Sequence, residues 1–133
     1  MLKPLLEKDI VLRHLIEEVI LTKAQIDTLL CEFEGSVKFE KLMERVNKRD
    51  RKNLTVGSYL RTKKQAYKRV KKMLKTILLL MYLGIITQDT LNALYKAASL
   101  LHQIKNKELT NAEKQNLIEL LEETVRRLIV ISQ

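Results

Sequence analysis

No glycine or proline interrupts the chain between Gly57 and Gly84, and the apolar residues in this stretch recur at helical spacing. With Tyr67 set at zero and a step of about 100° per residue, eight of them fall on one side of a helix. They are Leu60, Ala66, Val70, Met73, Leu74, Ile77, Leu80 and Met81. The pattern predicts a long amphipathic helix that begins at Thr55 or Ser58 and ends at Leu83.

The opposite side of this expected helix is cationic. It carries Arg61, Lys64, Lys68, Arg69, Lys71, Lys72 and Lys75, and no acid occurs between Arg61 and Lys75. Only Lys63 falls on the apolar side, where we expect its stem to lie on the core and its ammonium to reach water. Like charges four residues apart repel by a few tenths of a kcal/mol. A bound anion would relieve that repulsion.

Basic residues are concentrated in one region of the sequence. Residues 41–75 contain fourteen of the 25 Lys and Arg residues but only two acids, Glu44 and Asp50. A local field of this kind can orient a polyanion, and nucleic acid is the expected one. A basic face that is merely solvated is the alternative interpretation.

Beyond Lys75 the helix becomes apolar on every side, from Ile77 to Leu83. A helix that is apolar all round is normally buried. We therefore expect the end of the long helix to be the central element of the fold. The uncharged run from Thr76 to Gln88 is shorter than the roughly 20 apolar residues that a membrane helix needs.

The remaining chain also favours helices, because it has only three glycines and one proline. An aliphatic residue followed by threonine marks several helix starts, since threonine can accept a hydrogen bond from the first turn. The sequence predicts an all-α, single-domain bundle over residues 1–133, with about six helices and the long one at its centre. The expected helices are Pro4 to Ile20, Thr22 to Glu34, Ser36 to Asn47, Thr55 or Ser58 to Leu83, Thr87 to Ile104 and Thr110 to Ile131.

The segment from Leu54 to Gln65, read as Leu-Thr-Val-Gly-Ser-Tyr-Leu-Arg-Thr-Lys-Lys-Gln, resembles the turn and recognition helix of helix-turn-helix DNA-binding proteins. The resemblance is to archaeal and bacterial regulators and covers residues 37–70. It implies that the second helix enters the major groove with Tyr59 and Thr62 among the residues near DNA. Tyr59 pointing inward toward Leu54 is the alternative. The linker 47–53 is longer than the usual turn of that motif.

The basic helix-loop-helix segment at about 36–75 supplies the candidate contacts. The loop contributes four cations, and the long helix contributes cations together with two polar residues from the segment that carries the resemblance. The expected nucleic-acid-binding residues are Lys48, Arg49, Arg51, Lys52, Ser58, Arg61, Lys64, Gln65, Lys68, Arg69, Lys71, Lys72 and Lys75.

The sequence shows no motif for chemistry. His14 and His102 have no metal-ligand partners at suitable spacing, and no glycine-rich phosphate loop occurs. Cys31, the single cysteine, lacks an activating base in the sequence and has the helical spacing of a core residue. We expect no enzymatic activity, no metal, no cofactor and no small-molecule substrate. A lone cysteine and the absence of a secretory pattern favour the cytoplasm.

The leading hypothesis is a DNA-binding protein, either a small transcription regulator or a chromatin-type binder, that prefers duplex DNA to RNA. One alternative is an RNA-binding module, which the few aromatic residues near the basic face disfavour. Another is a structural or adaptor bundle that binds an acidic protein. Wide apolar faces on the first and last helices would also suit a homodimer.

Overall fold

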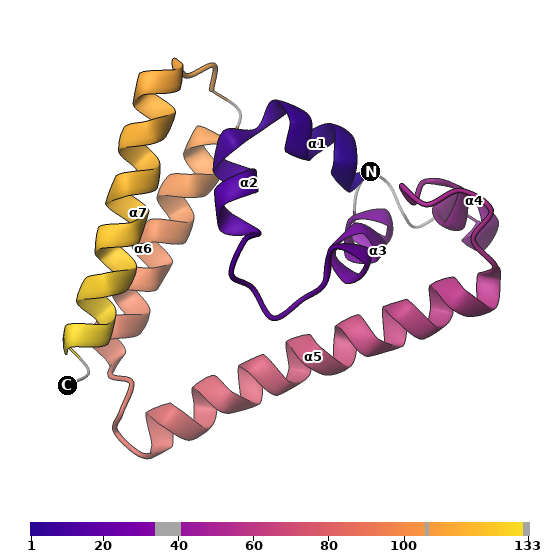
Figure 1. Ribbon diagram of the computed structural model, residues 1–133. Coiled ribbons are helices and arrows are strands. Elements are labelled where there is room, and N and C mark those ends of the chain that lie inside the picture. The colour runs from indigo at the N-terminus through magenta and orange to yellow at the C-terminus, as the bar shows by residue number, and fades with distance from the viewer. Residues whose placement is uncertain (34–40, 106, 132–133) are drawn as a thin grey trace. The chain divides into compact units, whose positions relative to one another are not determined.

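The computed structural model describes residues 1–33, 41–105 and 107–131, with side chains described as far as residue 127. This part of the chain folds into seven helices and contains no strand (Figure 1). The longest helix is α5, Val56–Tyr82, with 27 residues. The all-α class and the long helix that the sequence predicts are therefore confirmed.

The chain divides into two compact units, residues 1–73 and 74–133. The first unit contains α1 (Leu2–Lys8), α2 (Ile10–Leu15), α3 (Lys23–Phe33), α4 (Leu42–Asn47) and the first two thirds of α5. The second contains the end of α5, α6 (Gln88–Ile104) and α7 (Asn111–Ile131). The expectation of a single domain stays a prediction.

The first predicted helix is wrong, because it breaks at Asp9. The backbone of Asp9 is extended, with φ −119° and ψ 103°, and its carboxylate accepts a hydrogen bond of 3.0 Å from the N–H of Leu12. Aspartate favours this capping position over a helix interior because its side chain satisfies a free N–H of the next helix. The predicted start of the third helix, at Ser36, lies outside the described residues, and α4 begins at Leu42.

The expected threonine caps are confirmed. The Thr22 hydroxyl accepts from the N–H of Gln25 at 3.2 Å, and the Gln25 side chain accepts from the N–H of Thr22 at 3.0 Å. Thr55 and Thr110 cap α5 and α7 by accepting from the backbone three residues later, at 3.1 and 3.2 Å. Local side-chain chemistry thus sets several helix starts.

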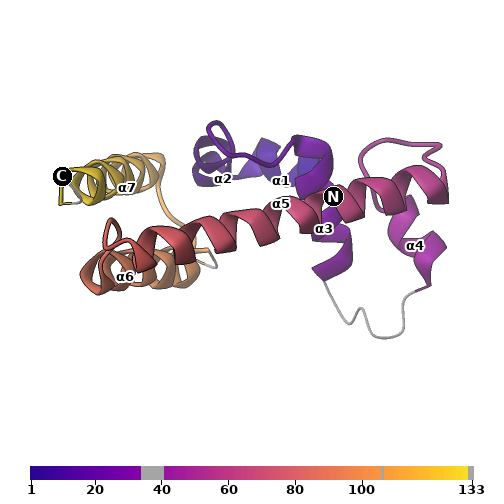
Figure 2. The ribbon, with the colours of Figure 1, turned by 90° about the horizontal axis from the view of Figure 1, so that it is seen from below.

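The far end of α5 is closed by Gly84, whose φ is +74°. The N–H of Ile85 donates to the carbonyl of Leu80 at 2.9 Å, and the N–H of Gly84 donates to that of Met81 at 3.0 Å. This pair of bonds is a Schellman arrangement, with Gly84 as the left-handed residue that ends the helix. Figure 2 shows α5 as one unbroken helix up to this turn.

The core of the first unit is small. Its main cluster joins Cys31 from α3, Val46 from α4 and Tyr59 from α5, and Leu2 and Ala66 are buried as well. Four partly buried residues pack against it, namely Met1, Leu42, Leu54 and Val56. Three helices that are separate in the sequence are therefore joined by one apolar cluster.

The expectation that the apolar end of α5 is buried is wrong. Leu78 and Leu79 are 64% and 55% exposed, and Tyr82 is 89% exposed. Only one side of this part of the helix, with Ile77, Leu80 and Met81, is half-buried. A helix that is apolar on every side is buried only if other elements pack on every side, and here they cover one side.

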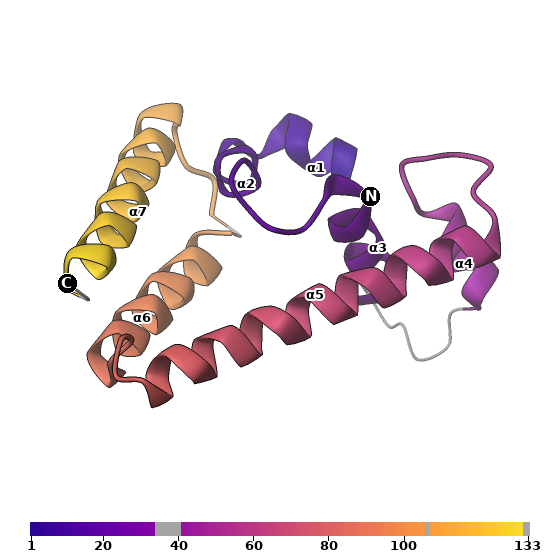
Figure 3. The ribbon, with the colours of Figure 1, turned by 60° about the horizontal axis from the view of Figure 1, so that its bottom comes forward.

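In the second unit, α6 and α7 form a helical hairpin (Figure 3). Thr90 and Ile118 are its buried residues within the described part of the unit. Many large apolar side chains of the pair remain exposed, including Leu94, Tyr95, Leu100, Leu120 and Val125. The hairpin thus leaves much of its apolar surface exposed.

Candidate nucleic-acid interface

Most of the predicted cations of α5 lie on its exposed face. The side chains of Arg61, Lys64, Lys68, Lys71, Lys72 and Lys75 are exposed. They span about 20 Å at a rise of 1.5 Å per residue. In the described part of the chain, no carboxylate pairs with Arg61, Lys64, Lys68, Lys71 or Lys75. We call the six exposed residues Arg61, Lys64, Lys68, Lys71, Lys72 and Lys75 the α5 cationic face.

Arg69 is exposed as well, but its guanidinium binds within the first unit. Its Nη1 atom donates to the backbone carbonyl of Ile20 at 2.8 Å and to the Gln25 side chain at 3.3 Å. Ile20 follows α2 and Gln25 belongs to α3. Arg69 therefore anchors α5 to the preceding helices, and a phosphate would have to share this group.

Lys63 differs from the expectation that its ammonium reaches water. The ammonium lies 3.0 Å from a carboxylate oxygen of Glu32 on α3, and the side chain is 28% exposed. The negative charge of Glu32 holds the Lys63 side chain on the side of α5 that faces α3. Lys63 is thus a structural cation between two helices.

The connection between α4 and α5 presents three of its four predicted cations. Lys48, Arg51 and Lys52 are exposed. Arg49 is 4% exposed, and its Nε atom lies 2.7 Å from a carboxylate oxygen of Asp27. The prediction that Arg49 contacts nucleic acid is therefore corrected, because burial and the ion pair remove its charge from the surface.

Asp27 organises the polar centre around Arg49. Its carboxylate also accepts from the N–H groups of Leu2 and Asp50, at 3.0 and 2.8 Å. Burial opposes ionisation of Asp27, but these hydrogen bonds, together with Arg49, outweigh it and lower the pKa of the carboxyl. The Arg49 guanidinium in turn donates to the Thr28 hydroxyl at 2.6 Å. This network fixes the start of the α4–α5 connection against α3.

A second buried acid, Glu32, fixes the beginning of α5. Its carboxylate accepts from the Tyr59 hydroxyl at 2.7 Å and from the Arg45 guanidinium at 3.1 Å. Burial would raise the pKa of Glu32, but the bonds from Tyr59 and Lys63 and the nearby cations lower it. Burial and the Glu32 charge raise the pKa of Tyr59.

Tyr59 is completely buried, so the placement of this residue near DNA is wrong and the inward alternative holds. Leu54 packs against the same cluster, as that alternative requires. Ser58 is half-buried and Gln65 is exposed. Of the polar residues that accompany the expected cations, Gln65 is thus the one on the accessible side of α5.

An exposed aromatic pair lies beside the α5 cationic face. The rings of Phe33 and Tyr67 meet edge to face, with centroids 6.3 Å apart and an interplanar angle of 74°. Phe33 is 69% exposed and Tyr67 is 40% exposed. The Lys63 ammonium lies 5.8 Å from the centre of the Tyr67 ring. Sequence reasoning missed this pair because Phe33 is distant in sequence, and no local signal links it to Tyr67.

Cys31 has the character of a core residue. It is completely buried, and burial together with the charge of Asp27 raises the pKa of its thiol to about 11. A nucleophilic cysteine instead has a lowered pKa and partial exposure. The environment of Cys31 therefore favours packing over chemistry.

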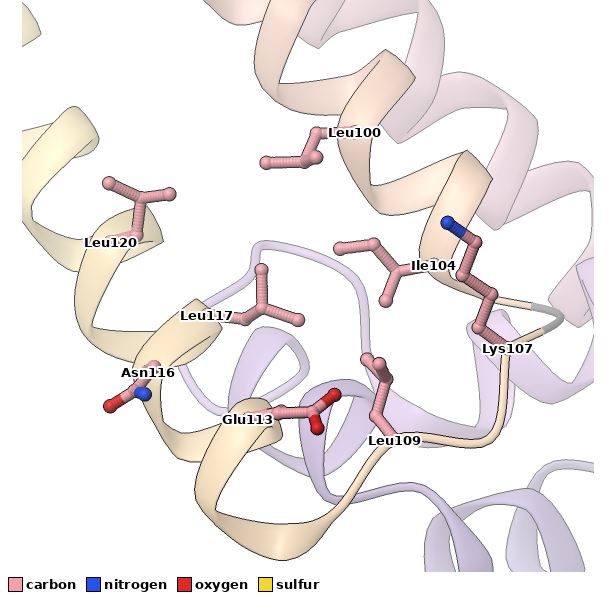
Figure 4. Close-up of a pocket in the computed structure, with 8 residues that line it drawn as sticks. All are labelled: Leu100, Ile104, Lys107, Leu109, Glu113, Asn116, Leu117 and Leu120. Atoms are coloured by element: carbon pink, nitrogen blue, oxygen red, sulfur yellow. The ribbon is translucent and has the colours of Figure 1, made fainter.

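The hairpin of the second unit contains an apolar groove. Two adjoining hollows of about 350 and 260 Å³ share Leu100 and Ile104 of α6 with Leu117 and Leu120 of α7. Figure 4 shows these four side chains directed toward the space between the helices, with Lys107 and Glu113 at its edge. Because the lining is mostly apolar and contains no cluster of titratable groups, the groove favours an apolar contact over a site for chemistry.

Neither a metal centre nor a membrane span was found among the described residues. In residues 1–33, 41–105 and 107–131, no three His, Cys, Asp or Glu side chains gather as a metal site would require. No helix in these ranges combines the length and the apolar character needed to cross a bilayer. The accessible cations of α5 remain the strongest candidate for a site.

No protein-family model matches the chain, and no similar protein was found among curated proteins or solved structures.

Proposed function

We propose that the protein binds the phosphate backbone of nucleic acid and catalyses no reaction. The observation that carries the proposal is the α5 cationic face, which presents six exposed Lys and Arg side chains on one helix. Duplex DNA is the first ligand to test, because it carries one phosphate per about 1.7 Å of its axis. A role in transcription regulation or chromatin would follow from such binding.

The arrangement of the first unit supports this proposal. Glu32 and Asp27 hold Lys63 and Arg49 inside the unit, so the acids of α3 pair with structural cations. The α5 cationic face contains no acid of its own between Arg61 and Lys75. Among the described residues, no carboxylate pairs with five of its six cations, namely Arg61, Lys64, Lys68, Lys71 and Lys75, and their positive field favours a polyanion.

A salt series tests the proposal. Neutralising five phosphates predicts a slope of about −4 to −5 for log K against log salt. The measurement is fluorescence anisotropy of a labelled 20-base-pair duplex between 50 and 200 mM salt. Affinity that does not change with salt, or no binding at low salt, would contradict the proposal.

Charge reversal locates the surface. The combined variant Lys64→Glu, Lys68→Glu and Lys71→Glu should abolish binding at physiological salt. The matched control reverses three exposed lysines elsewhere, with Lys8→Glu, Lys23→Glu and Lys105→Glu, and has the same net charge. If both variants lose affinity equally, overall charge rather than the α5 cationic face is responsible.

The α6–α7 groove favours a second candidate role, self-association. Its apolar lining is open. Lys96 of α6 and Lys107 of the α6–α7 connection line it as cations, and Glu113 of α7 lines it as an acid. In an antiparallel pair of chains, the lysines of one copy would face the glutamate of the other, so the charges are complementary. Two hairpins would then form a four-helix arrangement.

Molar mass in solution tests self-association. Light scattering should give twice the mass of the chain, and the variant Leu100→Glu, Leu120→Glu should give the single mass. The control is Leu78→Glu, Leu79→Glu, which changes two exposed leucines outside the groove. A wild-type chain that is monomeric at 100 μM would contradict this role.

A further inference from the structure

We infer that Phe33 and Tyr67 form a stacking platform for an unpaired nucleobase beside the α5 cationic face, so that the preferred ligand is a single-stranded segment of nucleic acid. The inference rests on the proposed function and refines its ligand. It also reverses the order expected from the sequence, in which the shortage of aromatic residues placed duplex DNA first.

The geometry of the pair carries the first step. Phe33 closes α3 and Tyr67 lies in the middle of α5, and the two rings stay in contact while most of Phe33 remains exposed. The rings meet edge to face, with an interplanar angle of 74°, so a base would stack on one ring at a time, and the contact limits the rotation of both rings. We call this edge-to-face pair the plate. A base has a π-face that can lie on such a plate, whatever its sequence identity.

Charge around the plate carries the second step. On α5, Lys64 precedes Tyr67 by three residues and Lys71 follows it by four, so both are its neighbours on the helix surface, with Cβ atoms about 5–6 Å apart. Both lysines are exposed. A nucleotide whose base lies on Tyr67 would place its phosphate within reach of Lys64 or Lys71.

The inner side of the plate is fixed by the first unit. Lys63 lies 5.8 Å from the centre of the Tyr67 ring and is held there by Glu32 at 3.0 Å. Glu32 is bound in turn by Tyr59 and Arg45. The ring of Tyr67 is thus supported from within the unit. A cationic row beside a supported aromatic plate is the combination that single-strand binding proteins use.

The experiment compares a labelled 12-nucleotide single strand with a duplex of the same sequence. Phe33→Leu and Tyr67→Leu keep apolar volume but remove the π-face. Each should weaken single-strand binding roughly 5- to 150-fold, the range that corresponds to one stacked base. Each should leave duplex binding within about twofold. Tyr67→Phe, which keeps the ring, should retain wild-type single-strand affinity.

The chain provides matched controls in Tyr82 and Tyr95, which are 89% and 75% exposed in the second unit. Tyr82→Leu and Tyr95→Leu should change neither affinity. An equal loss on both ligands from Phe33→Leu, or no loss on the single strand, overturns the inference while leaving the proposed function intact. No binding of the wild type to either ligand at low salt overturns the proposed function as well.

A spectroscopic signal provides a second readout. The chain contains no tryptophan, so Tyr67→Trp introduces a single indole emission. Stacking of a base on that indole should quench the emission when single-stranded DNA is added, and the quenching should saturate with the binding curve. Saturated binding without a change in emission would show that the plate is not occupied and would overturn the inference.

Discussion

The Nε atom of Arg49 lies 2.7 Å from a carboxylate oxygen of Asp27, and both side chains are at least 95% buried. A buried ion pair contributes little to net stability compared with apolar residues of the same shape, but breaking it leaves one charge buried and unpaired. The pair also links α3, which contains Asp27, to the segment between α4 and α5, which contains Arg49. The stability of the first unit should therefore depend on it.

The variant Asp27→Asn should destabilise the first unit by about 3–5 kcal/mol, because Arg49 loses its counter-charge inside the protein. Urea unfolding followed by circular dichroism measures this loss. The control is Glu18→Gln, which changes an exposed carboxylate and should alter the free energy of unfolding by no more than about 0.5 kcal/mol. Equal effects of the two variants would show that the pair is unimportant.

Acid should weaken the first unit through Asp27 and Glu32. Both carboxyls have pKa values lowered from their ordinary values of 3.8 and 4.5. As pH falls below about 4.5, the unfolded chain binds protons that the folded state does not, so the free energy of unfolding decreases. This stabilisation is complete above that range and is lost as pH falls through the folded pKa values.

The measurement for the acid prediction is the urea midpoint at pH 7, 5, 4 and 3. The wild-type midpoint should stay level from pH 7 to 5 and then decrease. In the variant Glu32→Gln the decrease should be smaller, because one of the two carboxyls no longer titrates. A wild-type midpoint that is the same at pH 5 and pH 3 would falsify the assignment of these carboxyls.

Helix boundaries that depend on local chemistry could be predicted from the sequence. Thr22 pairs with Gln25, and Gly84 and Ile85 donate to Met81 and Leu80. Both sets of bonds act over about one turn, so the spacing of these residues alone indicates a cap. Asp9 follows the same chemistry, but it lies inside an uninterrupted amphipathic pattern. Helical periodicity therefore continues across Asp9, although the helix ends there.

The buried acids could not be predicted from local pattern alone, because their partners lie far along the chain. A signal was present, however. Cys31 has the spacing of a core residue, and Asp27 lies one turn before it on the same face of α3. A buried acid requires a cation, and the loop of residues 47–53 contains Arg49, although its composition favours a surface location. Charge counting cannot separate such a structural arginine from exposed ones.

Cys31 should resist modification in the folded protein. Its thiol is completely buried and has a pKa of about 11, so roughly one molecule in a thousand carries the thiolate at pH 8. Ellman's reagent should react with less than a tenth of the thiol within an hour in buffer. In 8 M urea, the same sample should react completely within minutes. Rapid reaction in buffer would contradict the packing of α3 against α4 and α5.

Gly84 and Gly57 form a matched pair of substitutions. Gly84 has φ +74°, a conformation that an L-residue adopts at a cost. Gly57 lies in α5 without that strain. A Cβ added at either glycine would meet no neighbouring atom within 4 Å. Gly84→Ala should therefore lower the free energy of unfolding by about 1–2 kcal/mol. Gly57→Ala should raise it by up to about 0.5–1 kcal/mol. Urea unfolding of both variants measures the signs, and the prediction fails if Gly84→Ala is neutral or if Gly57→Ala is the more destabilising change.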